Sequence, residues 1–191
     1  MDKVQLQPNT MLFPLPATLV SCRADDYAPN IITISWIGIV CSKPPMLSIS
    51  VTPERHSHKI IKQAGAFVVN LTSEDNLIAA DYCGTKSGRD VDKFSELHLT
   101  PIPATKIDAP MIAECPVNLE CEIRQSYLLG SHEMFIAEIV AVHIDREVLK
   151  DNGRPDLDKI KPLVYCPTAS EYRGGLVKLL ARYGEAAKKN K

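Results

Sequence analysis

Residues 30–59, NIITISWIGIVCSKPPMLSISVTPERHSHK, decide the fold class of this chain. Apolar and polar residues alternate over 31–40 and again over 45–51, a pattern typical of β-strands because successive side chains point to opposite faces. A Pro-Pro turn separates the two runs, and the basic, hydroxyl-bearing segment 55–59 then opens a predicted helix. Two half-polar strands that lead into a helix start suit a flat ligand with a phosphate group, because the first N–H groups of a helix bind anions. Small β-barrels that bind no ligand show the same alternation, so this pattern alone leaves both interpretations open.

The bulk composition limits the class of protein. The chain has 191 residues, of which 45% are hydrophobic and 24% are charged, with a formal net charge of −1. These values are typical of a soluble globular protein, and we predict a single domain over 1–191. The balanced charge argues against nucleic acid or an anionic membrane as a partner. No apolar run reaches the roughly 18 residues needed to cross a bilayer, and the N-terminus lacks a signal-peptide pattern, so we expect a cytoplasmic protein.

The six cysteines give no sign of a metal site or a redox motif. None of them form a C-x-x-C pair, and no cluster of Cys and His has zinc-finger spacing. We predict that Cys22, Cys41 and Cys121, which lie in apolar strand patterns, are reduced core residues. Cys83 and Cys166 lie near predicted loops, where we expect exposed thiols.

The rest of the chain continues the β pattern. Strands are predicted over 17–23, 31–40, 45–51, 66–72, 117–127, 132–145 and 163–166. Helices are predicted over 57–64, ended by Gly65, and from 74 to 81, with an amphipathic helix in the tail 176–191. Antiparallel-looking strand pairs with short helices predict a mainly β fold, a closed barrel with helical insertions. No G-x-G-x-x-G or Walker loop is present, so the usual nucleotide-binding folds are not supported.

Two strands carry more specific expectations. Over 117–127 the alternation predicts that Val117, Leu119, Cys121, Ile123 and Tyr127 face the core and that Asn118, Glu120, Glu122 and Arg124 face water. The strand over 132–145 is apolar on both faces. One of those faces therefore needs a second cover, and a homodimer would supply it.

Five separated blocks of sequence resemble one known family. They are PATLVSC at 16–22, NIITISW at 30–36, KPPMLSISV with RHSHKI at 43–60, GAFVVN at 65–70 and LGSHEMFIAEIV at 129–140. Together they resemble the flavin reductase-like, FMN-binding split-barrel proteins, and within that family the flavoredoxins, over about 14–166. The resemblance implies a split β-barrel, a homodimer, and FMN bound non-covalently near the dimer interface. It also implies electron transfer or NAD(P)H-dependent flavin reduction, with a redox partner protein or NAD(P)H as the partner.

The resemblance also implies a set of cofactor-binding residues. Asn30 and Thr33 match positions that meet the polar edge of the flavin, and Trp36 and Tyr165 match aromatic positions near it. The segment with Arg55, His56, Ser57 and Lys59 matches the phosphate-binding turn of the family. Lys93 matches a lysine that reaches the flavin, and His132 matches a histidine beside the ring.

No catalytic residue is predicted, because the flavin itself carries the redox chemistry and no Ser-His-Asp or Cys-His arrangement is present. A Lys or His cation near the N1–C2=O edge of a flavin would stabilise its reduced form. Plainer explanations exist for single residues: Trp36 suits a core, Ser57 is a good helix N-cap, and Arg89 is expected to be a solvated loop arginine. The alternative function is a non-catalytic flavin-binding protein with no dedicated electron partner.

Overall fold

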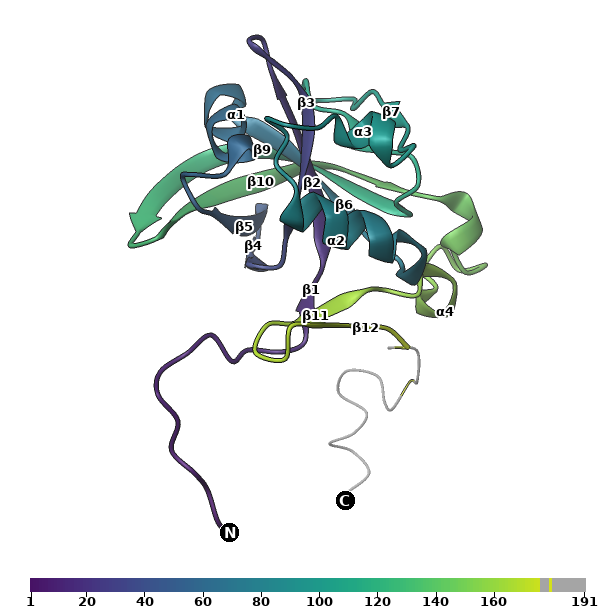
Figure 1. Cartoon of the computed structure of the whole chain (residues 1–191). Coiled ribbons are helices and arrows are strands. Elements are labelled where there is room, and N and C mark those ends of the chain that lie inside the picture. Colours follow the sequence, from purple (N-terminus) through teal and green to yellow (C-terminus); the bar gives the residue numbers. More distant parts are fainter. Residues whose placement is uncertain (176–178, 180–191) are drawn as a thin grey trace.

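The structure is a computed structural model that describes residues 1–175 and residue 179. The helix predicted over 176–191 lies outside the described residues. The residues before β1 (Leu15–Pro16) run away from the body of the molecule (Figure 1). Among the described residues, no helix has the length and apolar character needed to cross a bilayer.

A seven-stranded antiparallel sheet forms the body of the molecule. Its order is β3-β2-β6-β9-β10-β5-β4, with these bounds: β2 Thr18–Ala24, β3 Tyr27–Ile34, β4 Ile37–Ser42, β5 Pro45–Val51, β6 Ala66–Leu71, β9 Val117–Leu129 and β10 His132–Ile144. Smaller sheets join β1 with β11 (Val164–Cys166) and β12 (Glu171–Arg173), and β7 (Pro101–Ile102) with β8 (Met111–Ile112). The strands predicted over 17–23, 45–51, 66–72, 117–127, 132–145 and 163–166 are therefore confirmed, within one or two residues at their ends.

The single strand predicted over 31–40 is wrong, and the difference explains how the barrel closes. The chain breaks at Ser35 and Trp36 into β3 and β4, which are the two opposite edges of the sheet. The Ser50 N–H of β5 donates to the Trp36 carbonyl at 2.9 Å, which continues the β4–β5 pairing as far as the break, and only Ser35 and Trp36 join the two edges along the chain. The sheet must therefore curl until its edges meet at Ser35 and Trp36, the point that we call the seam. Trp36 is 40% exposed there and does not pack in the core.

The core lies inside the curled sheet and under the first helix. Phe67, Phe135 and Ile49 come from different strands of the sheet, and α1 (His56–Ala64) adds Ile60 and Ile61. Burying such apolar side chains stabilises the fold by roughly 1.5–3 kcal/mol each. The predicted helix end is confirmed, because Gly65 follows α1 in the left-handed region at φ 66°. Ser57 is not the N-cap; Arg55 holds that position, and Ser57 is buried in the first turn.

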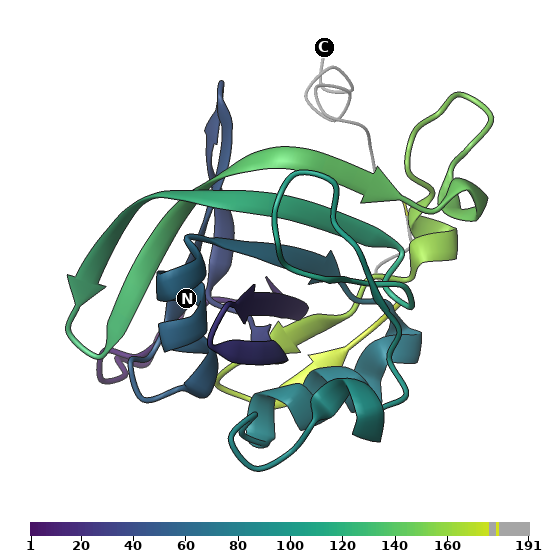
Figure 2. The ribbon, with the colours of Figure 1, turned by 90° about the horizontal axis from the view of Figure 1, so that it is seen from above.

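The second helical layer covers the other face of β2 and β3. A short 3-10 turn (Glu74–Asn76) leads into α2 (Leu77–Thr85), and a polar loop then leads into α3 (Lys93–Glu96). Cys83 and Phe94 from these helices pack against Leu19 and Ile31 of the sheet. Figure 2 shows the β9–β10 hairpin arching over one side of the molecule, with α2 and α3 on the opposite side. Two short elements, Arg146–Val148 and α4 (Leu157–Ile160), follow β10.

Three of the facing predictions for 117–127 are wrong. Asn118 and Glu120, which were expected to face water, are buried, because the proline-rich connection before β9 covers that face of the sheet. Tyr127, which was expected to face the core, is 47% exposed. The register of β9 against β10 shifts so that Arg124 is an extra residue between Ile123 and Gln125. A β-bulge of this kind reverses which face the following residues occupy.

All six cysteines are free. Cys22 and Cys121 are buried as predicted, and burial raises the pKa of each thiol to about 12. The core position predicted for Cys41 is wrong, because this residue lies on the edge strand β4 and is only partly buried. Cys166 is also partly buried, so its thiol is less exposed than expected. The exposed thiol expected at Cys83 is wrong, because α2 presses this side chain onto β3 and leaves it 1% exposed.

Candidate functional site

Two adjoining cavities lie where the chain crosses from β3 to β4. The seam cavity, about 520 Å³, is lined by residues 32–36 and 50–52 and by side chains from α2, β10, β11 and β12. The loop cavity, about 290 Å³, is lined by the start of α1, by the loop 86–89, and by Asn30, Cys83 and Lys93. Both cavities include Ile32 and Arg55, so they are continuous at these two residues.

Aromatic rings stand on two sides of the seam cavity. The Trp36 indole and the His132 imidazole lie nearly parallel, at an angle of 10° and with their centroids 6.3 Å apart. Tyr165 and Tyr172 form the other pair, with centroids 5.2 Å apart. Burial, together with the neighbouring carboxylate of Asp81, raises the pKa of Tyr172 to about 12, so its hydroxyl remains protonated and can donate. A flat, largely apolar ring fits a cavity with such walls.

Hydroxyl groups line the strand side of the seam cavity. Ser35, Ser50 and Thr52 are at the ends of β3 and β5, and sequence analysis did not identify them as site residues. Thr33 also lines this cavity, but its hydroxyl donates to the Ala80 carbonyl of α2. These hydroxyls lie beside a partly apolar wall. A few polar groups in a largely apolar cavity can orient the polar edge of a bound ring.

The loop cavity is lined by several cationic groups. Arg55, Lys86, Arg89 and Lys93 all line it, opposed by the carboxylate of Glu54. It also includes the first turn of α1, which no side chain caps. Because uncapped N–H groups and guanidinium groups both favour oxyanions, this cavity has the chemistry of a phosphate site.

Lys93 is the most deeply buried of these cations. It is 3% exposed, and its ammonium donates to the carbonyls of Ile31 at 2.6 Å and Cys83 at 2.9 Å. Burial lowers the pKa of Lys93, and the two carbonyl contacts fix the position of the charge. An ammonium has three N–H donors, so one remains for a ligand in the loop cavity. The structure therefore places Lys93 with the cationic residues and away from the aromatic walls.

A close approach between strand and loop forms the back of the loop cavity. The Asn30 amide donates to the Ser57 hydroxyl at 2.7 Å, which ties β3 to α1. Its oxygen lies 2.1 Å from where a Cβ would stand on Gly88, so only glycine fits at that position. Arg89 reaches back across the cavity and donates to the Glu54 carbonyl at 3.2 Å. The loop 86–89 is thus packed against Asn30 of β3 at Gly88, and Arg89 bonds it to the segment before α1.

His56 and Lys59 differ in their relation to the site. His56 lines the loop cavity, and its buried Nδ1 has no hydrogen-bond partner among the described residues. Burial lowers the pKa of His56, and the charges of Lys59, Arg89 and Lys93 lower it further, so the imidazole is neutral near pH 7. The Lys59 ammonium lies 4.5 Å from the centroid of the Tyr27 ring and lines neither cavity.

The structure therefore sorts the predicted residues into two groups. The seam cavity gathers Thr33, Trp36, His132 and Tyr165; the loop cavity gathers Asn30, His56, Ser57 and Lys93; Arg55 borders both. Lys59 belongs to neither group. Sequence analysis missed Asp81, Tyr172 and Lys86, whose local sequences carry no motif. Arg89 is exposed, as expected of a loop arginine, and it also lines the loop cavity. The neighbouring Gly88 is the one local signal for that second position.

Comparison with known proteins identifies the class. Residues 10–174 match the family model described as flavin reductase like domain, so the chain belongs to that family. Flavoredoxin of Desulfovibrio vulgaris (Miyazaki F) has a TM-score of 0.91 with this structure and 34% sequence identity, covering 97% of this chain and 100% of that chain. Flavoredoxin from Methanosarcina acetivorans has a TM-score of 0.90 and 26% identity, covering 100% of both chains. An uncharacterized protein of Archaeoglobus fulgidus is 31% identical over 147 residues, which is 77% of this chain and 81% of that protein. The predicted split-barrel fold is confirmed.

Proposed function

We propose that this protein binds FMN non-covalently and acts as a flavin-dependent oxidoreductase that passes electrons in the manner of a flavoredoxin or a flavin reductase. One observation carries the proposal: a cavity with aromatic walls and a cavity lined by cations meet at Ile32 and Arg55. FMN has the matching division, a flat ring at one end and a phosphate at the other.

The loop cavity is the proposed phosphate site. Arg55 and the uncapped start of α1 would bind the phosphate from one side, and the free N–H of Lys93 would bind it from the back. The neutral imidazole of His56 can donate a further hydrogen bond. Charge-assisted hydrogen bonds of this type contribute about 1.5–3 kcal/mol each.

The seam cavity is the proposed site of the isoalloxazine ring. The flavin, when bound, supplies the electron and hydride chemistry, and the protein positions it and excludes water from it. The rings of Trp36, His132 and Tyr165 would lie against the flavin, while Ser35 and Ser50 would meet its polar edge. The electron donor that we propose is NAD(P)H or a redox partner protein.

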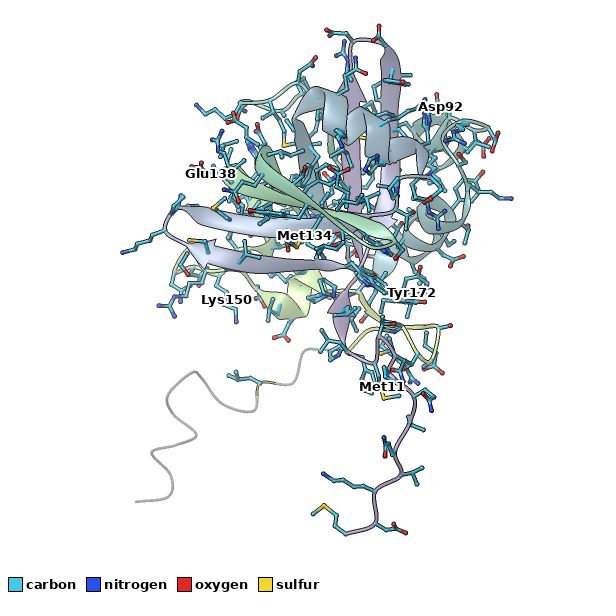
Figure 3. All side chains as sticks on the ribbon, turned by 90° about the vertical axis from the view of Figure 1, so that its left-hand side faces the viewer. Met11, Asp92, Met134, Glu138, Lys150 and Tyr172 are labelled. Carbon is cyan, nitrogen blue, oxygen red and sulfur yellow. The ribbon has the colours of Figure 1, made fainter. Side chains whose placement is uncertain are left out.

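We also propose a homodimer. The outward face of β10 carries Met134 and Ile136, which are only partly buried, and β4, on the far side of β5 in the same sheet, exposes Ile39 and Val40. Figure 3 labels Met134 on the ribbon, and this residue pairs with Ser50 of β5 at the rim of the seam cavity. A second copy packed on this apolar face would cover it and close the cavity mouth. A single monomeric species at micromolar concentration in analytical ultracentrifugation would contradict the dimer.

The test of the flavin proposal is direct. The purified protein should be yellow, and denaturation should release a chromophore with the mass of FMN. Under anaerobic conditions the visible absorption should bleach with NADH, with NADPH, or with a reduced redox protein. A colourless protein that also fails to bind added FMN would overturn the proposal.

A further inference from the structure

The first 14 residues of the chain form an arm that leaves the body of the molecule, and every one of them is exposed (Figure 1). Figure 3 labels Met11 on this arm, apart from the sheet. Met11, Leu12 and Phe13 are consecutive exposed apolar side chains. No charged residue occurs over 4–22. Solvated chain ends are typically polar and charged, so an apolar, uncharged arm is suited to pack against another surface.

The segment 9–13 of the arm has the form of a strand that lacks a partner. Pro8 and Pro14 bound it, and neither has an N–H, so five consecutive N–H groups stand between two prolines. The hydrogen bonds that the structure describes for this segment are local, such as the 2.8 Å bond from the Leu12 N–H to the Thr10 carbonyl. Exposed local bonds of this kind can be exchanged for pairing with another strand at little cost in free energy.

The strand β4 offers a matching edge. It is the last strand of the seven-stranded sheet, and within the described part of the chain it pairs only with β5. Both of its faces are open as well, because Ile39 is exposed on one face and a Cβ added to Gly38, on the other face, would meet no atom within 4 Å. No residue of β4 is charged. Folded proteins seldom leave such an edge free, because its unpaired N–H and C=O groups recruit other strands.

The usable part of this edge is the half that adjoins the seam. Val40 is an extra residue between Ile39 and Cys41 in the pairing with β5, and a β-bulge of this kind bends the strand. The regular edge therefore runs over 37–39, directly after Trp36. The opposite edge strand, β3, is less suited, because α2 and α3 pack against it and its Pro29 has no N–H to donate.

The arm also starts at the seam. Leu15 of β1 pairs with Tyr165, which lines the seam cavity, so the root of the arm and the start of β4 adjoin the same cavity. Within one copy, however, the arm runs away from the sheet (Figure 1). A second copy packed over the mouth of the seam cavity would bring its own β4 within reach of the arm.

We propose that the arm of each copy adds as a strand to the β4 edge of a second copy, with residues 11–13 beside residues 37–39. The inference rests on the homodimer proposed above and names the segments that hold it together. The exchange is reciprocal, as a two-fold symmetric interface requires, and each arm supplies main-chain hydrogen bonds together with apolar side chains. The arm would also cover the half-exposed indole of Trp36, so each seam cavity would be completed by the other copy.

The test places opposite charges on the two segments. Leu12→Lys on the arm and Ile39→Glu on β4 alter exposed side chains, so neither should disturb the core. We expect each substitution alone to raise the dimer dissociation constant roughly tenfold or more, because a charge would then lie against an apolar strand. An equimolar mixture of the two variants should form a heterodimer in which one contact is a Lys–Glu pair and the other is unsubstituted. The matched control is Ile78→Glu, at an exposed isoleucine of α2, which should neither weaken the dimer nor rescue Leu12→Lys.

A second measurement does not depend on charge. Cys41 and Cys166 are the two cysteines that are not buried, and both are first replaced by serine. When proteins carrying Leu12→Cys and Ile39→Cys are mixed and oxidised, we expect a disulfide between two different chains, because cysteines on paired strands lie close enough to form one. Ile78→Cys in place of Ile39→Cys should give no such product.

The outcomes separate the arm from the dimer as a whole. Rescue by mixing, together with the disulfide between chains, supports the exchange. A wild-type dimer that Leu12→Lys and Ile39→Glu leave unchanged would overturn the inference and leave the homodimer standing, and so would a Leu12→Cys/Ile39→Cys double variant that closes a disulfide only within one chain. A monomeric wild-type protein would overturn both. A colourless protein that binds no FMN would contradict the flavin proposal alone, since none of these measurements uses the flavin.

Discussion

Two buried charges, Glu120 and Lys93, show how structural and ligand-binding polar groups differ in this molecule. Glu120 is completely buried, and its carboxylate accepts the N–H groups of Thr105, Lys106 and Ile107, the Thr105 hydroxyl and a contact from His143. Lys93 is almost as buried, but only two carbonyls accept from its ammonium, which borders an open cavity. A buried charge with a complete set of partners stabilises the fold, whereas one with an incomplete set beside a cavity is suited to bind a ligand.

The largest expected effect is the loss of stability when Glu120 is replaced. Glu120→Leu removes the acceptor from the N–H groups of Thr105 and Lys106, whose bonds to the fully buried carboxylate are partly buried. We therefore expect a loss of about 3–5 kcal/mol in the free energy of unfolding. The control Glu122→Leu, on the same strand but partly exposed and paired only at the surface with Arg124, should cost less than about 1 kcal/mol. If urea unfolding gave the same loss in the free energy of unfolding for Glu120→Leu and Glu122→Leu, the structural role of Glu120 would be contradicted.

Low pH should weaken the stabilisation that Glu120 provides. Burial raises the pKa of Glu120, but the hydrogen bonds from Thr105, His143 and Lys106 outweigh it and hold the pKa at about 2, below its ordinary value of 4.5. Since the folded pKa is depressed, the stabilisation is complete above the unfolded pKa and is lost as the pH falls from about 4.5 to about 2. At one pKa unit per 1.36 kcal/mol, the full contribution is about 3 kcal/mol.

The difference in unfolding free energy between the wild type and Glu120→Gln isolates this contribution from that of other carboxylates. We expect the difference to shrink steadily across the acid range. A difference that stays constant from pH 6 to pH 2 would contradict the assignment.

The ligand-binding member of the pair should respond in affinity. Lys93→Met keeps the length of the side chain and removes its charge, so FMN binding should weaken by about 1.5–3 kcal/mol. Riboflavin, which has no phosphate, should bind nearly as before. Lys59→Met is the matched control, because Lys59 lines neither cavity and should leave FMN affinity unchanged.

Redox titration of Lys93→Met sharpens the placement. With the ammonium at the phosphate, the midpoint potential of bound FMN should stay close to that of the wild type. A fall of about 30 mV or more, equivalent to about 1.4 kcal/mol for a two-electron couple, would place Lys93 beside the flavin ring instead.

The smallest expected effect concerns the aromatic wall. Trp36→Ala removes a ring that faces the seam cavity. We expect the binding free energy of both FMN and riboflavin to weaken by about 0.5–1.5 kcal/mol more than the lost contact area alone would account for. Tyr127→Ala, at an exposed aromatic residue outside both cavities, serves as the control. A loss confined to FMN would show that Trp36 does not contact the ring.

Alternation along the chain predicts most of the strands, because one face of each strand lies on the core. It fails at Arg124, where a bulge reverses the faces, and at Asn118 and Glu120, where a distant connection covers polar residues. Neither the bulge nor the covering loop leaves a periodic signal in the local sequence.

The residues of the site also divide into those that the sequence could identify and those that it could not. The start of α1 could be found from the sequence because its basic and hydroxyl-bearing residues are contiguous. The walls of the seam cavity could not be found completely, since Asp81 and Tyr172 reach it from α2 and β12 only through tertiary packing. The resemblance to flavoredoxins supplied Lys93, His132 and Tyr165, and the structure added which of the two cavities each one lines.

The order of the strands also sets when a flavin can bind. The β2–β3 and β4–β5 hairpins are neighbours in the sequence, yet they stand at opposite edges of the sheet, separated by β6, β9 and β10. During synthesis the sheet that joins the two hairpins cannot be completed until the chain has emerged as far as Ile144, the end of β10, and Tyr165 and Tyr172 of the seam cavity emerge later still. The strand pairs that link the hairpins, such as β2 with β6 and β5 with β10, join segments that are far apart in the sequence. Such pairs form late, because closing long loops costs entropy before the pairing compensates for it. A flavin in the seam cavity would therefore bind only the finished barrel, and its binding would lengthen the lifetime of the folded state without hastening its formation.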